Sequence, residues 1–372
     1  MWLCSTCMKL HAWSRPCSSH NGDMILAPFN GYNAYFLIHM NLPTVPVENP
    51  DNNVVVEYVS CLNLQLLNSV FQKQIPTAKT IPPKCRLQFL RVLKSTLDKV
   101  ISYTGDTSTW IQLILFPICI LRVYSPKCSF EEKSSIRNKL QAASINQAIM
   151  RWREPNGCSF LVHKILEELN HPRNKKKGNK KISQNAINLR ICLKNIRIGL
   201  FTAAIKVLSS NGIAPNDEAT LNELLSKHPQ AHPPHIPPHQ AHLDNISTNS
   251  EVILNRLKSF PKGTACGRDG LRVQHLLDAL SGPAAAITDE LLSSITRIIN
   301  LWLSGRCPPQ LGEFVASAPL TPLLKPDGNI RPIAVGTIWR RIVSKFAAHT
   351  VCKEMSSFLG DYQFGVFYAA AS

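Results

Sequence analysis

The sequence predicts a mainly α-helical protein with a small α+β part. Apolar residues recur at steps of three and four in several windows, which is the helical period. The 26 prolines outnumber the 17 glycines and separate these windows. One turn sequence, Pro326-Asp327-Gly328-Asn329, marks a β-hairpin near the carboxyl end. We therefore expect helical modules and linkers, followed by a small part that contains strands.

Composition narrows the class of protein. Hydrophobic residues make up 44% of the 372 residues, which excludes wholesale disorder. The first ten residues lack the apolar core of a signal peptide. The longest apolar run, 111–121, is about half of the ~20 residues that a membrane span requires. We expect an intracellular protein, nuclear or cytoplasmic, with reduced cysteines and no membrane contact.

The net charge is +17, from 41 Lys and Arg against 24 Asp and Glu. A field of this sign attracts polyanions, so RNA and DNA are the expected partners. Ribosome-bound chains, membrane-surface proteins and poorly behaved translated fragments are also basic. The sequence leaves the oligomeric state open.

Residues 1–24 contain a candidate zinc knuckle. Its ligands are Cys4, Cys7, Cys17 and His20, with His11 as an alternative to His20. Two close pairs of soft ligands suit tetrahedral Zn²⁺, and four protein ligands leave no position for a reactive water. The zinc is therefore expected to be structural, and the alternative is a set of unliganded thiols in a frayed terminus.

An irregular linker, 25–83, is expected next, with a short strand at Val54–Val59 between several prolines. Residues 84–170 read as a helical module. Within it, helices are expected at 87–101 and at about 130–150, and the apolar run 111–121 is expected to be a buried core segment.

Residues 171–183 form a basic linker with the cations Lys175, Lys176, Lys177, Lys180 and Lys181. Such density of charge cannot be buried, so the segment is a solvated linker, a nuclear-import signal or an arm that contacts phosphates. A second helical module is expected at 184–227, with two helices that meet near Gly199 and a third from about Asp217 to Lys227.

The segment 228–243 places five histidines among prolines and is expected to be an extended spacer, with metal capture as the alternative. A helical connector, 244–310, contains a helix at 287–303. The last part, 311–372, contains the hairpin and a helix from about Thr337 to Met355. The apolar arc of that helix holds Ile338, Trp339, Ile342, Val343 and Phe346, and its other side holds Arg340, Arg341 and Lys345.

Lys325 and Arg331 flank the hairpin turn. With a loop of Asp327 to Asn329 they lie opposite one another on one face of the ribbon. Two adjacent cations repel each other unless an anion lies between them, and the planar Arg fork suits phosphate oxygens. The alternative is an exposed hairpin whose cations only keep it soluble.

Several segments resemble a known family. "GRDGLRVQHLLDAL", "LTPLLKPDGNIRPIAVGTIWRRIVSKFAAH" and "LGDYQFGV", in this order, are similar to the amino-terminal and fingers region of reverse transcriptases from non-LTR (LINE-like) retrotransposons. Upstream, "CMKLHAWSRPC", "FTAAIKVLSSNGIAP" and "TLNELLSKHP" resemble the zinc-bearing and helical region that precedes the polymerase in such elements. The resemblance covers most of the chain and is most specific from about Gly267 to Val366.

The resemblance implies that 311–372 is a partial fingers subdomain. Lys325 and Arg331 match the pair that reaches the triphosphate of the incoming nucleotide. The helix with Trp339, Arg340, Arg341 and Lys345 resembles the part that packs the fingers and lines the template path. Gln363 belongs to a Gln-Phe-Gly segment near template and nucleotide.

The full-length family also holds Mg²⁺ on palm aspartates, including an Asp-Asp pair, and this sequence contains no such pair. The sequence thus predicts a polymerase fragment that is truncated before the palm and is inactive alone. The alternatives are a non-catalytic zinc-containing RNA- or DNA-binding protein derived from a retroelement, and a decayed reading frame. Loss of the palm would expose apolar surface at Ile338, Ile342, Phe346 and Phe364.

Overall fold

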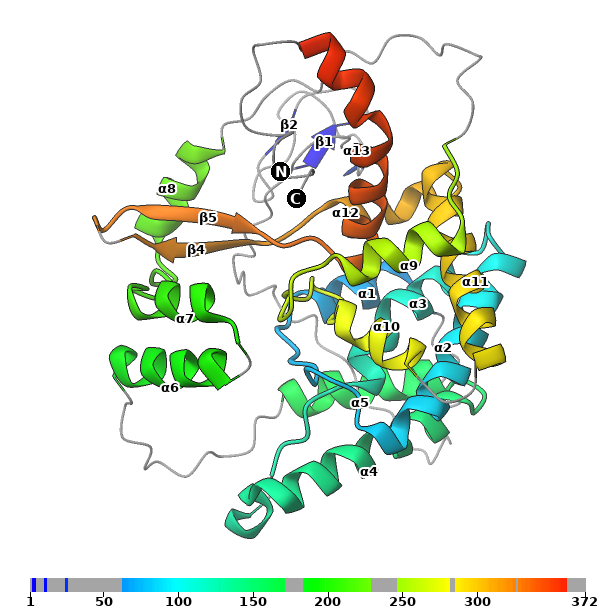
Figure 1. Ribbon diagram of the computed structural model, residues 1–372, viewed down its shortest axis with the longest axis horizontal. Coiled ribbons are helices and arrows are strands. Elements are labelled where there is room, and N and C mark those ends of the chain that lie inside the picture. The colour runs from blue at the N-terminus through cyan, green and yellow to red at the C-terminus, as the bar shows by residue number, and fades with distance from the viewer. Residues whose placement is uncertain are drawn as a thin grey trace, which may run out of the picture.

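A computed structural model describes residues 62–126, 128–170, 183–197, 199–228, 246–281, 285–325 and 327–359, together with three short strands near the amino end. These strands, β1 (Trp2–Cys4), β2 (Leu10–His11) and β3 (Met24–Ile25), pair antiparallel in the order β2-β1-β3. The rest is mainly helical with a two-stranded antiparallel sheet, which confirms the predicted fold class. Figure 1 shows the arrangement.

The helices expected from the sequence are present. They are α2 (Arg86–Ser102), α4 (Ser134–Trp152), α6 (Gln184–Arg197), α7 (Phe201–Leu208), α8 (Glu218–Lys227), α11 (Ala285–Leu303) and α13 (Ile338–Leu359). Gly199 lies between α6 and α7 with a φ of 75°, a conformation that glycine adopts without steric cost. The apolar run becomes α3 (Thr107–Ile120), and its side chains are buried as expected.

Other helices have weaker sequence signals and were not predicted. They are α1 (Leu64–Phe71), α5 (Gly157–Asn170), α9 (Ser250–Lys258), α10 (Val273–Leu280), α12 (Gly312–Ala316) and the 3₁₀ turns η1 (Pro83–Cys85), η2 (Ser129–Glu132) and η3 (Pro309–Leu311). Side-chain caps begin several helices. Asn63, Asp106, Asp217 and Asn249 each accept a hydrogen bond from a backbone N–H of the first turn.

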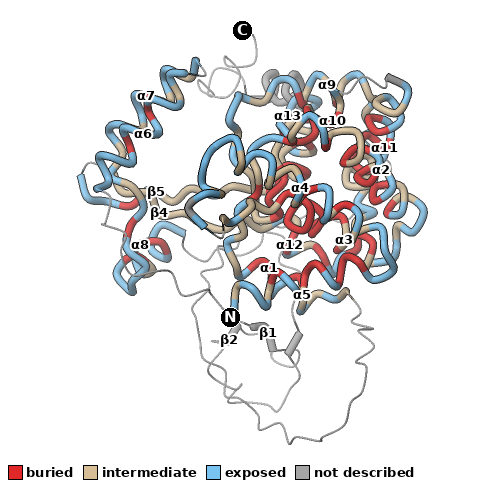
Figure 2. The backbone as a smooth tube through the Cα atoms, turned by 90° about the horizontal axis from the view of Figure 1, so that it is seen from below, coloured by how far each residue is buried: buried red, intermediate tan, exposed pale blue. Residues whose placement is uncertain are grey.

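One hydrophobic core joins segments that are far apart in the sequence. It contains side chains from α1 to α5 and from α9 to α13, including Phe89, Trp110, Leu276, Ile295 and Trp339. In Figure 2 the buried residues gather among these helices, whereas α6 and α7 are mostly exposed. Segment 84–170 and segment 244–310 therefore share a core, although their boundaries as domains stay predictions.

Hydrogen bonds also connect segment 244–310 to segment 84–170 and to the residues just before it. Thr77 Oγ1 donates to the Gly270 carbonyl oxygen at 2.7 Å, and the Ile81 N–H donates to Asp278 Oδ2 at 2.8 Å. Ser294 Oγ donates to Asp98 Oδ1 at 2.6 Å. Buried polar groups that pair in this way fix the register of the packing, because an unpaired one would be costly.

The prediction of exposed apolar surface on α13 is wrong for the residues whose side chains are described. Ile338 and Ile342 are 0% exposed and Phe346 is 8% exposed. The physical reason is that α13 packs on α9 and α11, which cover its apolar arc. Phe364 lies outside the described residues. Among the described helices, none combines the length and the apolar character that a bilayer crossing requires.

Candidate nucleic-acid interface

The hairpin consists of β4 (Leu320–Leu324) and β5 (Ile330–Ala334). Gly328 has a φ of 81°, its N–H donates to the Lys325 carbonyl oxygen at 3.1 Å, and the Lys325 N–H donates to the Asn329 carbonyl oxygen at 2.8 Å. Asp327 Oδ1 accepts the Asn329 N–H at 3.1 Å. Asp327 and Gly328 thus have the turn roles that the sequence predicted.

The register differs from the expected one. Leu323 pairs with Arg331 and Leu324 with Ile330, so Lys325 lies opposite Asn329 and not opposite Arg331. The expected loop was residues 327–329, whereas the observed loop is one residue earlier. Asn329 pairs with Lys325 and therefore belongs to the strand side of the turn. Lys325 and Arg331 still lie on the same face of the ribbon, as diagonal neighbours whose backbones are roughly 7–8 Å apart.

The opposite face of the hairpin is anchored. Leu320, Leu324 and Ile330 pack with Ala214 and with Leu224 of α8 in a second, smaller hydrophobic cluster. Residues 212–214 also pair with β4, since the Ala214 N–H donates to the Pro322 carbonyl oxygen at 2.9 Å and the Leu324 N–H to that of Gly212 at 3.0 Å. The face with the two cations is therefore the one directed away from this cluster.

Helix α8 also covers the outer edge of β5 (Figure 1). Glu223 Oε1 accepts the Ile330 N–H at 2.7 Å, and Lys227 Nζ donates both to Glu223 Oε1 and to the Ile330 carbonyl oxygen. These two side chains replace the hydrogen bonds that a further strand would make.

Two carboxylates lie near Lys325 and have other partners. Hydrogen bonds from Asn329 lower the pKa of Asp327, and hydrogen bonds from Lys227 and the Ile330 N–H lower that of Glu223; the charge of Lys325 adds to both effects. Within the described ranges no carboxylate lies at ion-pair distance from Lys325 or Arg331. Both cations remain available to an external anion.

The basic side of α13 meets the end of α9 around one aromatic ring. The Arg341 guanidinium lies 5.4 Å and the Lys345 ammonium 4.7 Å from the centre of the Phe260 ring. Arg341 Nη1 donates to the Ala265 carbonyl oxygen at 3.0 Å, and Lys345 Nζ to that of Ser259 at 3.1 Å. Cation–π contacts and backbone acceptors thus hold both cations in place.

A third cation joins this group. Burial lowers the pKa of Lys345, and the charges of Arg256 and Arg341 lower it further. Arg256 Nε is buried without a hydrogen-bond partner. We call Arg256, Phe260, Arg341 and Lys345 the Phe260 cluster. In the described part of the chain none of its cations forms an ion pair with a carboxylate, so the positive charge of the cluster is not neutralised by an acidic side chain there.

The other residues that the sequence assigned to the template path lie elsewhere on α13. Trp339 is 1% exposed and packs in the core. The Arg340 side chain lies beside Gly336, where an added Cβ would be 3.3 Å from Arg340 Cδ. The structure therefore brings Arg341 and Lys345 together, whereas Trp339 takes the packing role. Sequence reasoning missed Phe260 and Arg256, and a Phe that follows a basic helix end was the available signal.

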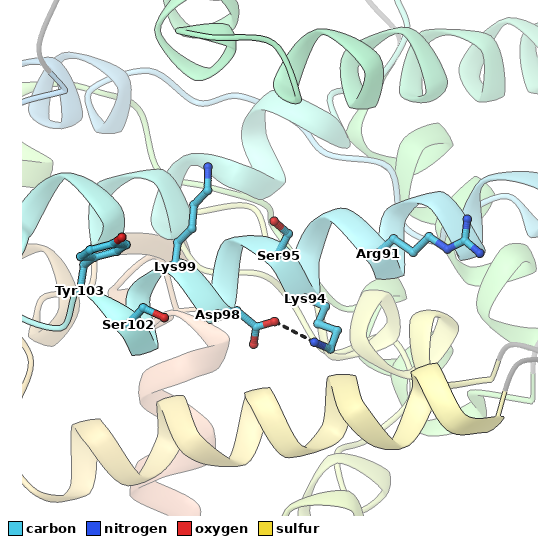
Figure 3. Close-up of a pocket in the computed structure, with 7 residues that line it drawn as sticks. All are labelled: Arg91, Lys94, Ser95, Asp98, Lys99, Ser102 and Tyr103. Carbon is cyan, nitrogen blue, oxygen red and sulfur yellow. Dashed lines mark hydrogen bonds and ion pairs between the residues drawn. The ribbon is translucent and has the colours of Figure 1, made fainter.

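Two surface hollows also contain cations. One, of about 370 Å³, follows α2 and is lined by Arg91, Lys94, Asp98 and Lys99 among others (Figure 3). There Lys94 pairs with Asp98 at 2.8 Å and with Glu290 at 3.5 Å, so part of the charge is neutralised. The other, of about 400 Å³, is lined by Arg190, Leu193, Lys194 and Arg197 of α6 and has no carboxylate in its lining.

The remaining predicted site residues lie outside the part whose side chains are described. They are Cys4, Cys7, Cys17, His20, Lys175, Lys176, Lys177, Lys180, Lys181 and Gln363. The zinc site, the basic linker and the Gln-Phe-Gly segment therefore stay predictions. In the described ranges, no three His, Cys, Asp or Glu side chains gather closely enough to hold a metal ion.

Comparison with known proteins finds similarity to a short part of one retroelement protein. No protein-family model matches the chain, and no solved structure matches it. The chain is 28% identical over 122 residues to the retrotransposable element SLACS 132 kDa protein of Trypanosoma brucei gambiense. The aligned part is 32% of this chain and spans only 10% of that protein. The similarity supports a distant relation to a retroelement protein.

Proposed function

We propose that this chain is a retroelement-derived protein that binds RNA or DNA by contacting phosphates. The Phe260 cluster carries the proposal. Three cations converge there without a carboxylate partner in the described residues, and the pKa of Lys345 is lowered first by burial and further by the repulsion of Arg256 and Arg341. A phosphate between them would remove this repulsion and would supply acceptors for the guanidinium and ammonium donors that remain exposed. The net charge of +17 and the relation to a retroelement protein support the same function.

The finer proposal is that the chain is part of an RNA-directed DNA polymerase and that its hairpin contacts nucleotide phosphates. The support is that Lys325 and Arg331 share the unanchored face of the hairpin and have no ion-pair partner among the residues described. Because the sequence contains no Asp-Asp pair, polymerisation by this chain alone is not part of the proposal. Zn²⁺ on Cys4, Cys7, Cys17 and His20 remains part of it as a structural ion.

Salt-dependent binding tests the proposed function. The full chain is titrated into a fluorescent 20-nucleotide RNA and the matching DNA between 50 and 200 mM salt, and anisotropy gives the affinity. We expect a steep fall with salt, and a slope of log K against log salt that is smaller by about 1 to 2 in R341Q/K345Q, since each lost phosphate contact removes about 0.7 to 0.9.

The matched control is R91Q/K99Q, which removes the same charge from exposed positions on α2. Unfolding midpoints of all variants are measured in the same buffer. Equal slopes for R341Q/K345Q and the control would show that the Phe260 cluster does not bind the nucleic acid. A parallel titration with a nucleoside triphosphate and Mg²⁺ tests K325Q/R331Q, and unchanged affinity would remove the finer proposal.

A further inference from the structure

A long stretch of the chain has no negative side chain. Residues 169–216 contain ten Lys and Arg and no Asp or Glu. The described cations of this stretch are Arg190, Lys194, Arg197 and Lys206, and the first three lie on α6. A helix without carboxylates cannot neutralise its own cations through neighbouring pairs, as α2 does with Lys94 and Asp98.

The three cations of α6 form a row. Their spacing of four and then three residues places them on one face of the helix, where they line the hollow of about 400 Å³ with Leu193. Seven residues of helix correspond to roughly 10 Å along the axis. The phosphates of one nucleic-acid strand follow one another at about 3.4 Å of axial rise, so the row spans about three of them. A single small anion would occupy only part of it.

A second element contributes a cation to this row. Lys79 belongs to the segment that leads into α2, and it lies near enough to Lys194 for the charge of that residue to affect its pKa. Desolvation and the Lys194 charge lower the pKa of Lys79, and Arg272 adds to the effect. The two positive charges repel each other, and an anion between them would relieve this repulsion.

Arg272, at the start of α10, extends the cationic surface. Its Nε is buried without a partner, and its Nη1 donates to the Thr264 carbonyl oxygen at 3.5 Å. Thr264 is in the segment 259–265, whose carbonyl oxygens at Ser259 and Ala265 accept from Lys345 and Arg341. Gly263, in the same segment, faces Leu200 beyond the end of α6. This segment therefore connects the Phe260 cluster with the surroundings of α6.

We propose that Lys79, Arg190, Lys194 and Arg197 form a second phosphate-binding site, which holds the backbone of a nucleic-acid strand along α6. The proposal rests on the proposed function, because it extends the contact of the Phe260 cluster to a second element. An acidic protein segment is the competing ligand, and the experiment below separates the two.

The test uses the full chain and two readouts. The first is anisotropy with the 20-nucleotide RNA and DNA at 150 mM salt, where K79Q/K194Q is expected to weaken binding about tenfold and to lower the salt slope by about 1 to 2. R91Q/K99Q is the control of equal charge. The second readout is lysine acetylation by a limiting reagent, followed by mass spectrometry of the wild type with and without the oligonucleotide. Because this second readout uses only the wild-type protein, it does not depend on whether a variant folds.

Protection of Lys79 and Lys194, with Lys99 labelled at an unchanged rate, supports the proposal. Equal binding by K79Q/K194Q and R91Q/K99Q, together with unprotected Lys79 and Lys194, would overturn it. So would equal protection by poly-glutamate at the same charge concentration, because the site would then be a general anion surface. If R341Q/K345Q weakens binding, while K79Q/K194Q binds like the control and Lys79 and Lys194 stay unprotected, only this inference fails. If the wild type does not bind at all, the proposed function fails first.

Discussion

At the scale of single residues, Asp269 is a buried carboxyl group in the turn that precedes α10. It is 1% exposed, Oδ1 accepts the Leu271 N–H at 3.3 Å, and Oδ2 has no partner. Burial raises the pKa of Asp269 from 3.8 to about 7. Since the folded state holds this proton more tightly than the unfolded state, the contribution to stability is fully present below pH 4 and is lost as the pH rises to 7.

We therefore expect D269N to weaken the pH dependence of unfolding. The Asn side chain keeps an acceptor for the Leu271 N–H and does not ionise, so at pH 8 the variant should gain up to about 4 kcal/mol relative to the wild type, from the shift of about three pH units. Urea denaturation at pH 5 and at pH 8 measures this difference. The same loss of stability between these two pH values in both proteins would contradict it.

At the scale of elements, the hairpin depends on α8 for its position. Glu223 is ionised at neutral pH and accepts the Ile330 N–H, and the hydrogen bonds from Lys227 and from this N–H lower its pKa. E223A should therefore raise the amide exchange rate of Ile330 several-fold, because the N–H then faces solvent. In the wild type, the protection should be present at neutral pH and should disappear as the pH falls through the lowered pKa.

Amide exchange measured by NMR for the wild type, E223A and E218A tests this role. Glu218 is an exposed carboxylate on the same helix and is the control. Comparable protection of Ile330 in all three proteins would mean that α8 does not cap the edge of β5.

The sequence was most informative about elements with local causes. Periodic apolar residues predicted α2, α11 and α13, and the Asp327-Gly328 pair predicted the turn. The predicted register was wrong because the loop was placed one residue too late. The sequence does not distinguish Asn329 as a loop residue from Asn329 as the residue that closes the hairpin. The Phe260 cluster was half predicted: Arg341 and Lys345 share a helix face, but their ring lies about eighty residues earlier in the chain, and only tertiary packing brings it there.

At the scale of the whole molecule, the shared core implies that its two parts unfold together. Leu276 of α10 is 0% exposed in that core. L276A should cost about 2–5 kcal/mol through lost contacts and a residual cavity. The amides of α2 and α11 should lose protection by the same factor, although they are almost two hundred residues apart in sequence.

The matched control is L208A on α7, where the side chain is 54% exposed and the loss should stay within about 0.5 kcal/mol. Hydrogen exchange read by mass spectrometry follows peptides from α2 and α11 separately. Loss of protection in α11 alone would show that the two segments have independent stability in spite of their common core.

The outer edge of β5, which α8 covers, affects how the protein behaves at high protein concentration. Pro332 has no N–H to offer, and the donor and acceptor of Ile330 are already occupied by α8. From Ile330 to Pro332 this edge offers no free N–H to a neighbouring strand, which disfavours the strand addition that leads to edge-to-edge aggregation. The hairpin can thus project its cations into solvent without recruiting other chains through its backbone.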